Sequence, residues 1–158
     1  MTEPPKSILA LDLGSQLGWA VRLHGGPITS GSVSFKPGRF EGAGMGFLRF
    51  RRWLDEVAET SGGLETVYFE EVRAHAGTLA AQVYGGFLGH LTAWCEANRA
   101  PYLGVPVATI KKFATGKGNA DKQAVIAAVK AKGFQPQDDN EADALALLLW
   151  AMTQQGGK

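Results

Sequence analysis

The alternation of apolar and polar positions divides the chain into short segments of two kinds. Period-two patterns and short apolar runs predict strands over residues 7–14, 18–24, 28–35, 65–72 and 101–107. Apolar residues at helical spacing, and one long apolar run at 144–152, predict helices over residues 44–59, 78–98, 108–115 and 120–133 and a last one after Pro136. Three strands that can form an antiparallel meander therefore precede an alternation of strands and helices.

This order of elements predicts the α/β class. A meander followed by alternating strands and helices favours a mixed sheet with helices on its faces. The length of 158 residues is typical of one domain with a core of its own. No internal repeat, low-complexity tract or linker divides the sequence, so we expect a single domain over residues 1–158.

Composition and cysteine content indicate the class of protein and its cellular compartment. Hydrophobic residues make up 45% of the chain and charged residues 20%, as in ordinary globular proteins. No window resembles a membrane span, and the first residues lead into a strand pattern rather than a signal peptide. The single cysteine, Cys95, excludes an internal disulfide and is typical of helix packing. We therefore expect a reducing, cytoplasmic location and no membrane partner.

Charge is unevenly distributed along the chain. The formal net charge is only +1, yet residues 99–132 carry seven basic side chains against one acidic side chain, Asp121. Arg49, Arg51 and Arg52 form a second basic cluster. A charged run is often only a solvated face, but this distribution is also what a polyanion-binding surface requires.

Acidic residues stand where predicted strands end and where the last predicted helix begins. Asp12 ends the first strand, Glu70 lies at the end of the fourth, and Asp139 and Asp143 open the last helix. If the first and fourth strands are neighbours, their carboxylates lie side by side, and a helix starting over that edge adds Asp143 and, one turn earlier, Asp139. Glu71, one step along the strand, should point to the other face.

A simpler interpretation of these acids competes with a shared site. Carboxylates are favoured at helix N-termini by the helix dipole, and Asn140-x-x-Asp143 is related to a capping box. The shared site has physical support of its own. Several ionised carboxylates in a small site need a counter-charge, and their oxygen ligands suit Mg²⁺ or Mn²⁺. The histidines and the cysteine are scattered, without zinc spacing. Two Mg²⁺ or Mn²⁺ ions about 4 Å apart form the two-metal site used in phosphodiester hydrolysis.

Four segments, "ALDLGSQLGWAV", "FEEV", "IKKFATGKGNADK" and "EADALAL", resemble the RuvC-type Holliday-junction resolvases of the ribonuclease H-like superfamily. They occur in the family's order and cover nearly the whole chain. The Asp-x-Gly pattern alone is weak, because sugar kinases and actin-like ATPases share it. The resemblance implies a ribonuclease H-like mixed five-stranded sheet with helices on both faces, forming one RuvC-like nuclease domain, and the short chain is compatible with a phage-type member.

The resemblance also implies the metal ligands. The family's acids fall on Asp12, Glu70 and Asp143. Many bacterial members carry an Asp or a His three residues before the last acid, where this chain has Asn140. Some mitochondrial relatives space the pair by four, which selects Asp139 as fourth ligand and leaves Asn140 as ligand or helix cap. The implied cofactor is Mg²⁺, with Mn²⁺ as substitute, at two ions per site, and no small-molecule cofactor is expected.

The family's DNA-facing lysines match Lys111 in "TIKKF" and Lys122 in "NADKQ". Lys112 and Lys117 lie in the same basic segment and join them as candidate nucleic-acid contacts. Arg73, in the loop after the fourth strand, is a further candidate nucleic-acid contact. It stands where some relatives carry an aromatic residue that wedges into the junction, so junction opening would need another group.

The activity implied is a divalent-metal-dependent endonuclease of DNA recombination and repair. It would resolve four-way junctions by symmetric paired nicks that leave 5′-phosphates. Symmetric cutting needs two active sites, hence a homodimer, and the family's contact helix places candidate interface residues at Gly85, Gly86 and Phe87.

Two alternatives remain open from the sequence. One is another ribonuclease H-like nuclease that acts on forks, flaps or RNA, such as a YqgF-like enzyme. The other is a junction-binding module without catalysis, for which Asn140 is the sole support in the sequence. Product symmetry on a four-way junction distinguishes the first alternative, and a metal titration distinguishes the second.

Overall fold

The computed structural model describes residues 6–156, and the elements follow the predicted order. The strands are β1 (Ser7–Asp12), β2 (Gln16–Arg22), β3 (Ile28–Ser34), β4 (Leu64–Glu71) and β5 (Tyr102–Pro106). The helices are α1 (Gly44–Thr60), α2 (Thr78–Ala97), α3 (Val107–Thr115), α4 (Lys122–Ala131) and α5 (Asp139–Gly156). The bounds differ from the predicted ones by a residue or two at most strand and helix ends.

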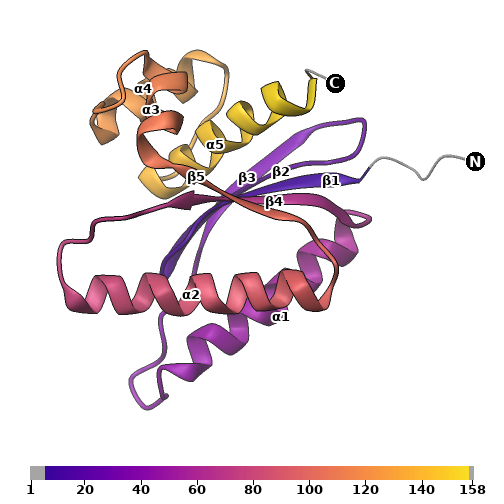
Figure 1. Cartoon of the computed structure of the whole chain (residues 1–158), viewed down its shortest axis with the longest axis vertical. Helices are drawn as coiled ribbons and strands as arrows, with labels where there is room; N and C mark the ends of the chain where they lie inside the picture. The colour runs from indigo at the N-terminus through magenta and orange to yellow at the C-terminus, as the bar shows by residue number, and fades with distance from the viewer. Residues whose placement is uncertain (1–5, 157–158) are drawn as a thin grey trace, which may run out of the picture.

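The described strands form one mixed sheet in the order β3-β2-β1-β4-β5 (Figure 1). β1 pairs antiparallel with β2, and β2 pairs antiparallel with β3. β4 pairs in parallel with both β1 and β5. The predicted five-stranded mixed sheet, a meander followed by parallel strands, is confirmed.

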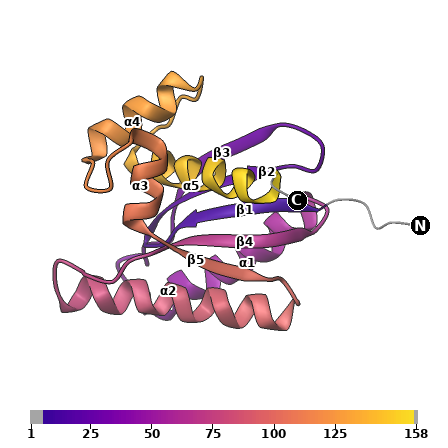
Figure 2. The same cartoon turned by 45° about the horizontal axis from the view of Figure 1, so that its top comes forward.

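Helices cover both faces of the sheet, and Figures 1 and 2 agree on their sides. α1 and α2 pack on one face, where Leu9 and Leu11 of β1 join Phe69 of β4 in a buried cluster. α3, α4 and α5 pack on the other face with Ile8 and Ala10. Because side chains alternate along a strand, Asp12 continues the series that faces α5. The same parity, through Tyr68, places Glu70 on that face too.

The start of α5 is held against the sheet by hydrogen bonds from β3 and by its own cap. The hydroxyl of Ser30 donates to Glu141 at 2.7 Å, and that of Ser32 donates to Asp138 at 2.7 Å. Asp138 accepts the Glu141 N–H at 2.8 Å, and Glu141 accepts the Gln137 N–H at 2.8 Å. The cap therefore uses Asp138 and Glu141.

The capping role considered for Asn140-x-x-Asp143 is wrong, because the helix starts earlier than that pair requires. Asp139 is already the first residue of α5, so Asp143 lies in its second turn, where backbone N–H groups are bonded within the helix. The Asp143 carboxylate therefore does not cap the helix.

Close approach of β2 to α5 depends on Gly18. A Cβ at this position would lie 1.9 Å from the backbone oxygen of Asn140. We expect Gly18→Ala to lower the free energy of unfolding by about 2 kcal/mol, because the start of α5 must move away from the sheet. Chemical denaturation measures this. Gly14→Ala is the matched control, since its Cβ would meet nothing closer than 3.6 Å. Equal stability of the two variants would contradict this packing.

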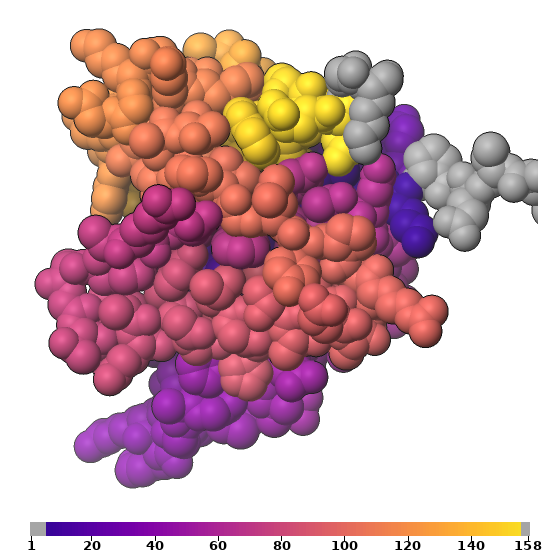
Figure 3. All heavy atoms as spheres, viewed as in Figure 1, coloured from indigo at the N-terminus to yellow at the C-terminus, as the bar shows by residue number. Residues whose placement is uncertain are grey.

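α2 lies along the surface, where Figure 3 shows it between α1 and the α3–α4 region. Two of the three residues proposed for a dimer contact on this helix are not available for one. Phe87 is 2% exposed and packs against Phe47 and Phe50. A Cβ at Gly86 would lie 2.4 Å from the Phe47 ring, so this glycine serves the contact between α1 and α2. Gly85 has open space around it.

Two smaller expectations concern Cys95 and membrane spans. Cys95 is fully buried in the core beneath α2, as its interpretation as a packing residue predicts. No helix within residues 6–156 has the length and apolar character needed to cross a membrane.

Candidate metal centre

Three carboxylates meet where β1 and β4 end beneath α5. The parallel register pairs Leu11 with Phe69, so the next residues, Asp12 and Glu70, lie beside each other. α5 crosses this edge and adds Asp143. Among residues 6–156, Asp12, Glu70 and Asp143 each offer a carboxylate oxygen within 4.8 Å of the others, and each side chain is partly buried. Strand register and helix placement thus bring together acids that are distant in the sequence.

The three carboxyl groups hold their protons more tightly than isolated ones. Burial, followed by the charges of Glu70 and Asp143, raises the pKa of Asp12 well above its usual value. Burial and then the Asp143 charge raise the pKa of Glu70 to about 7. Burial and then the Asp139 charge raise the pKa of Asp143 to about 6. The cause is crowded negative charge in a partly dry site, which a cation would relieve.

The donor set fits a hard divalent cation. Carboxylate oxygens are the ligands that Mg²⁺ and Mn²⁺ prefer. A cleft of about 490 Å³ opens at the same end of the sheet; its lining includes Leu13, next to Asp12 in the sequence, but none of the three carboxylates. The geometry therefore supports a metal site made by Asp12, Glu70 and Asp143.

Asp139 lies one helical turn before Asp143 and outside the group of three. Its carboxylate forms an ion pair with Lys122, at 3.2 Å between Oδ2 and Nζ. Its charge still raises the pKa values of Asp12 and Asp143, so it lies within electrostatic range of the site. Its role as fourth ligand stays a prediction.

Solved structures, but no family model and no curated protein, match this chain. T. thermophilus RuvC in complex with a Holliday junction substrate aligns over 97% of this chain and 97% of its own, with a TM-score of 0.77 and 24% identity. A second Thermus thermophilus RuvC structure aligns over 96% of each chain, with a TM-score of 0.74 and 24% identity. The chain has a RuvC-type fold.

The yeast mitochondrial Holliday junction resolvase Ydc2 supports the same fold at lower identity. It aligns over 99% of this chain and 81% of its own, with a TM-score of 0.64 and 12% identity. The RuvC-type resemblance stated from the sequence motifs is therefore confirmed as a fold.

The predicted basic residues of this RuvC-type fold divide into two groups. Lys111 on α3 and Lys122 at the start of α4 lie near the carboxylates, because the charge of each lowers the pKa of Asp143. Lys112 and Lys117 are exposed and make no ion pair in the described structure. Arg73 follows β4, is 79% exposed and pairs with Glu71 at 3.0 Å.

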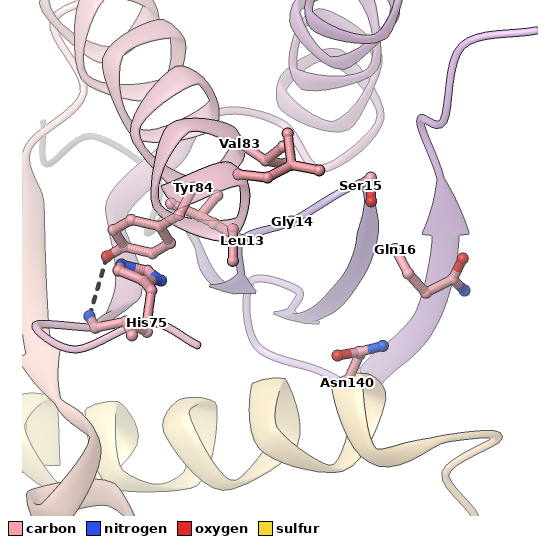
Figure 4. A pocket seen from close by; sticks show the side chains of 11 residues that line it. Leu13, Gly14, Ser15, Gln16, His75, Val83, Tyr84 and Asn140 are labelled. Carbon is pink, nitrogen blue, oxygen red and sulfur yellow. Dashed lines mark hydrogen bonds between the residues drawn. The ribbon is translucent and has the colours of Figure 1, made fainter. Parts of the chain in front are cut away.

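Three parts of the chain line the cleft at this end of the sheet (Figure 4). Gly14, Ser15 and Gln16 come from the turn after β1. His75 and the α2 side chains of Val83 and Tyr84 form another wall, and Asn140 of α5 completes it. The lining residues are Leu13, Gly14, Ser15, Gln16, Val72, His75, Leu79, Ala80, Val83, Tyr84 and Asn140.

Tyr84 has a polar role that no sequence pattern indicated. The ring does pack, since it is partly buried against the core, but its hydroxyl bonds to the backbone of β4 at Glu70 and Val72. No local pattern marks this contact, because it joins residues 12 and 14 positions apart on different elements. The cap at Asp138 and Glu141 had a clearer signal, an acid three residues before another acid.

Proposed function

We propose that this chain is a divalent-metal-dependent endonuclease that resolves four-way DNA junctions by symmetric paired nicks leaving 5′-phosphates. The observation that carries the proposal is the group of Asp12, Glu70 and Asp143 at the end of β1 and β4. Its support is a RuvC-type fold over nearly the whole chain, shared with a RuvC in complex with a Holliday junction substrate. Residues 1–158 would act as one nuclease domain.

In this mechanism Asp12, Glu70 and Asp143 hold the cations, and Asp139 assists from the preceding turn of α5. Two Mg²⁺ ions, or Mn²⁺ in their place, would supply Lewis acidity toward water and the scissile phosphate. Pairing with β2 fixes Asp12, and pairing with β5 fixes Glu70. The capped, hydrogen-bonded start of α5 fixes Asp143. The three ligands are thus held in place before substrate arrives.

Lys111 and Lys122 offset negative charge where the DNA backbone meets the carboxylates. Lys111 lowers the pKa values of Glu70 and Asp143, and Lys122 pairs with Asp139. Lys112, Lys117 and Arg73 are exposed and available to phosphates farther from the cut. Such contacts give affinity without sequence readout.

We expect Lys111→Ala to reduce the cleavage rate about 30-fold, because one preorganised positive charge is lost beside the scissile phosphate. Lys112→Ala is the matched control, since this neighbour is exposed and shifts no pKa among the carboxylates. Single-turnover cleavage at saturating enzyme separates the rate from DNA affinity. A Lys111→Ala rate equal to that of Lys112→Ala would contradict the placement of Lys111 beside the scissile phosphate.

Symmetric cutting requires two sites, so the proposed active form is a homodimer. α2 offers a surface for it: Ala81, Gly85, Gly89 and Ala93 are exposed at a spacing of four residues, which aligns them on one side of the helix. Small side chains allow a second helix to approach closely. We expect Gly85→Arg to convert the dimer to a monomer by light scattering and to uncouple the two nicks. A wild-type monomer at micromolar concentration would contradict this interface.

Cleavage of a synthetic four-way junction with Mg²⁺, Mn²⁺ or EDTA, by wild type and Asp143→Asn, tests the proposal. Paired symmetric nicks that need metal and vanish in the variant are the expected result. Cutting of forks, flaps or RNA alone would keep the chemistry and replace the substrate. Tight junction binding without cutting in any metal would leave a binding module and overturn the proposed enzyme.

A further inference from the structure

The hydroxyl of Tyr84 bonds to β4 at the metal-binding end of the sheet. It donates to the backbone oxygen of Glu70 at 2.8 Å and accepts the N–H of Val72 at 3.2 Å. Figure 4 shows the tyrosine reaching from α2 to this strand end, with a hydrogen bond drawn at its hydroxyl. A single side chain thus binds the backbone on both sides of Glu71.

This pair of hydrogen bonds takes the place of the bonds that a longer β1 would make to β4. Val67 donates its N–H to Pro101 beside β5, so by alternation the backbone groups of Glu70 and Val72 face β1. Pairing between β1 and β4 ends at Leu11 and Phe69. In a parallel ladder the C=O of one residue and the N–H of the second residue after it bind one residue of the next strand. The Tyr84 hydroxyl makes those two bonds where β1 has ended.

The hydroxyl is held by packing of the rest of the side chain. The Tyr84 ring lies 4.9 Å from the His75 ring, between centroids, and contacts the buried cluster beneath α2. α2 is therefore linked to the strand end that carries a candidate metal ligand.

We propose that Tyr84 is a positioning residue, which extends the hydrogen bonding of the sheet past the end of β1 and so fixes the backbone from which Glu70 reaches the metal site. This inference rests on the proposed function for the identity of the site. Without the hydroxyl, two backbone groups at the β4 end lose their partner on the β1 side, and the strand end is then held from the β5 side, where Glu70 pairs with Val105. The carboxylate is then less well placed for a cation, although every ligand is still present.

Tyr84→Phe, compared with Tyr102→Phe, tests this role. Both changes remove one oxygen, and within residues 6–156 the Tyr102 hydroxyl bonds only to Glu96. We expect Tyr84→Phe to raise the Mn²⁺ concentration for half-maximal activity about tenfold and to lower kcat about tenfold, as for other groups that orient a metal ligand. KM for the junction should stay within twofold. Mn²⁺ should also raise the Tm of Tyr84→Phe less than that of Tyr102→Phe, a readout that needs no DNA.

The proposal would be overturned if Tyr84→Phe and Tyr102→Phe agreed within twofold in kcat and in the Mn²⁺ concentration for half-maximal activity. A measurement on the wild-type protein covers the case in which Tyr84→Phe fails to fold. Hydrogen exchange should show the Val72 amide protected like that of Val67, which is bonded to Pro101. Rapid exchange at Val72 would overturn the proposal as well. If the wild type cuts no junction, the proposed function fails, while the metal-dependent Tm and the amide exchange still decide the role of Tyr84.

Discussion

Glu70→Gln should lower junction cleavage by about 1000-fold, while Glu71→Gln should leave it within threefold of wild type. The two acids are neighbours in β4, but they differ in what they face. Glu70 lies within 4.8 Å of Asp12 and Asp143 through its carboxylate oxygen. Glu71 pairs with the exposed Arg73. The glutamine keeps the shape of the side chain and removes one of the charges that would hold the cations.

Single-turnover cleavage in Mg²⁺ and binding of the junction in EDTA separate the loss of chemistry from the loss of affinity. We expect both variants to bind the junction with at least one third of the wild-type affinity, because each change removes a negative charge and none of the ion pairs among residues 6–156 uses the Glu70 carboxylate. Similar cleavage losses in Glu70→Gln and Glu71→Gln would move the metal site away from the described group. Weak binding by Glu70→Gln alone would indicate that this acid acts in substrate placement.

The sequence was sufficient for the parts of the site that depend on strand order. Alternation of apolar residues predicts where β1 and β4 end, and a parallel pairing then places Asp12 beside Glu70. Asp143 needed more than periodicity, since an acid near a helix start has a second explanation in capping. The resemblance to the RuvC-type motifs decided between the two, and the structure agrees because Asp138 and Glu141 form the cap.

Contacts between side chains of separate elements could not be predicted in the same way. The ion pair between Asp139 and Lys122 depends on how α4 docks beside α5, which no periodicity specifies. Two of the three predicted dimer residues, Gly86 and Phe87, are unavailable for a related reason. Phe87 lies on the helix expected to form the contact, but the side of α2 that faces the core depends on its packing with α1. Element order is encoded locally, whereas the rotation of a helix about its axis is decided by the core.

The start of α5 combines groups that stabilise the fold with groups that oppose it. Asp138 and Glu141 satisfy the helix start and anchor it to β3. Asp143, one turn farther along, contributes a charge to a crowded site. Without a cation, Asp138 and Glu141 stabilise the folded chain, whereas Asp143 destabilises it. Binding of the proposed cation would therefore be coupled to folding through one helix.

Without metal, the protein should lose stability as pH rises from about 5 to 8. The folded-state pKa values of Glu70, about 7, and Asp143, about 6, lie above those of the unfolded chain, about 4. Between these values the folded protein binds more protons than the unfolded protein, so the free energy of unfolding falls as pH rises. After allowance for solvent screening, the two groups together give about 3 kcal/mol, or a Tm lower by roughly 6–12 °C.

Thermal unfolding in EDTA at pH 5, 6, 7 and 8 measures this loss. Asp143→Asn should flatten the profile and unfold at a higher temperature than wild type at pH 8, because it removes one of the crowded charges. Glu71→Gln should keep the wild-type slope, since Glu71 lies outside the group. Mg²⁺ or Mn²⁺ should restore the wild-type Tm at pH 8 and do much less for Asp143→Asn. A flat wild-type profile in EDTA would mean that the three carboxylates are not crowded in solution, and the metal site would lose its electrostatic basis.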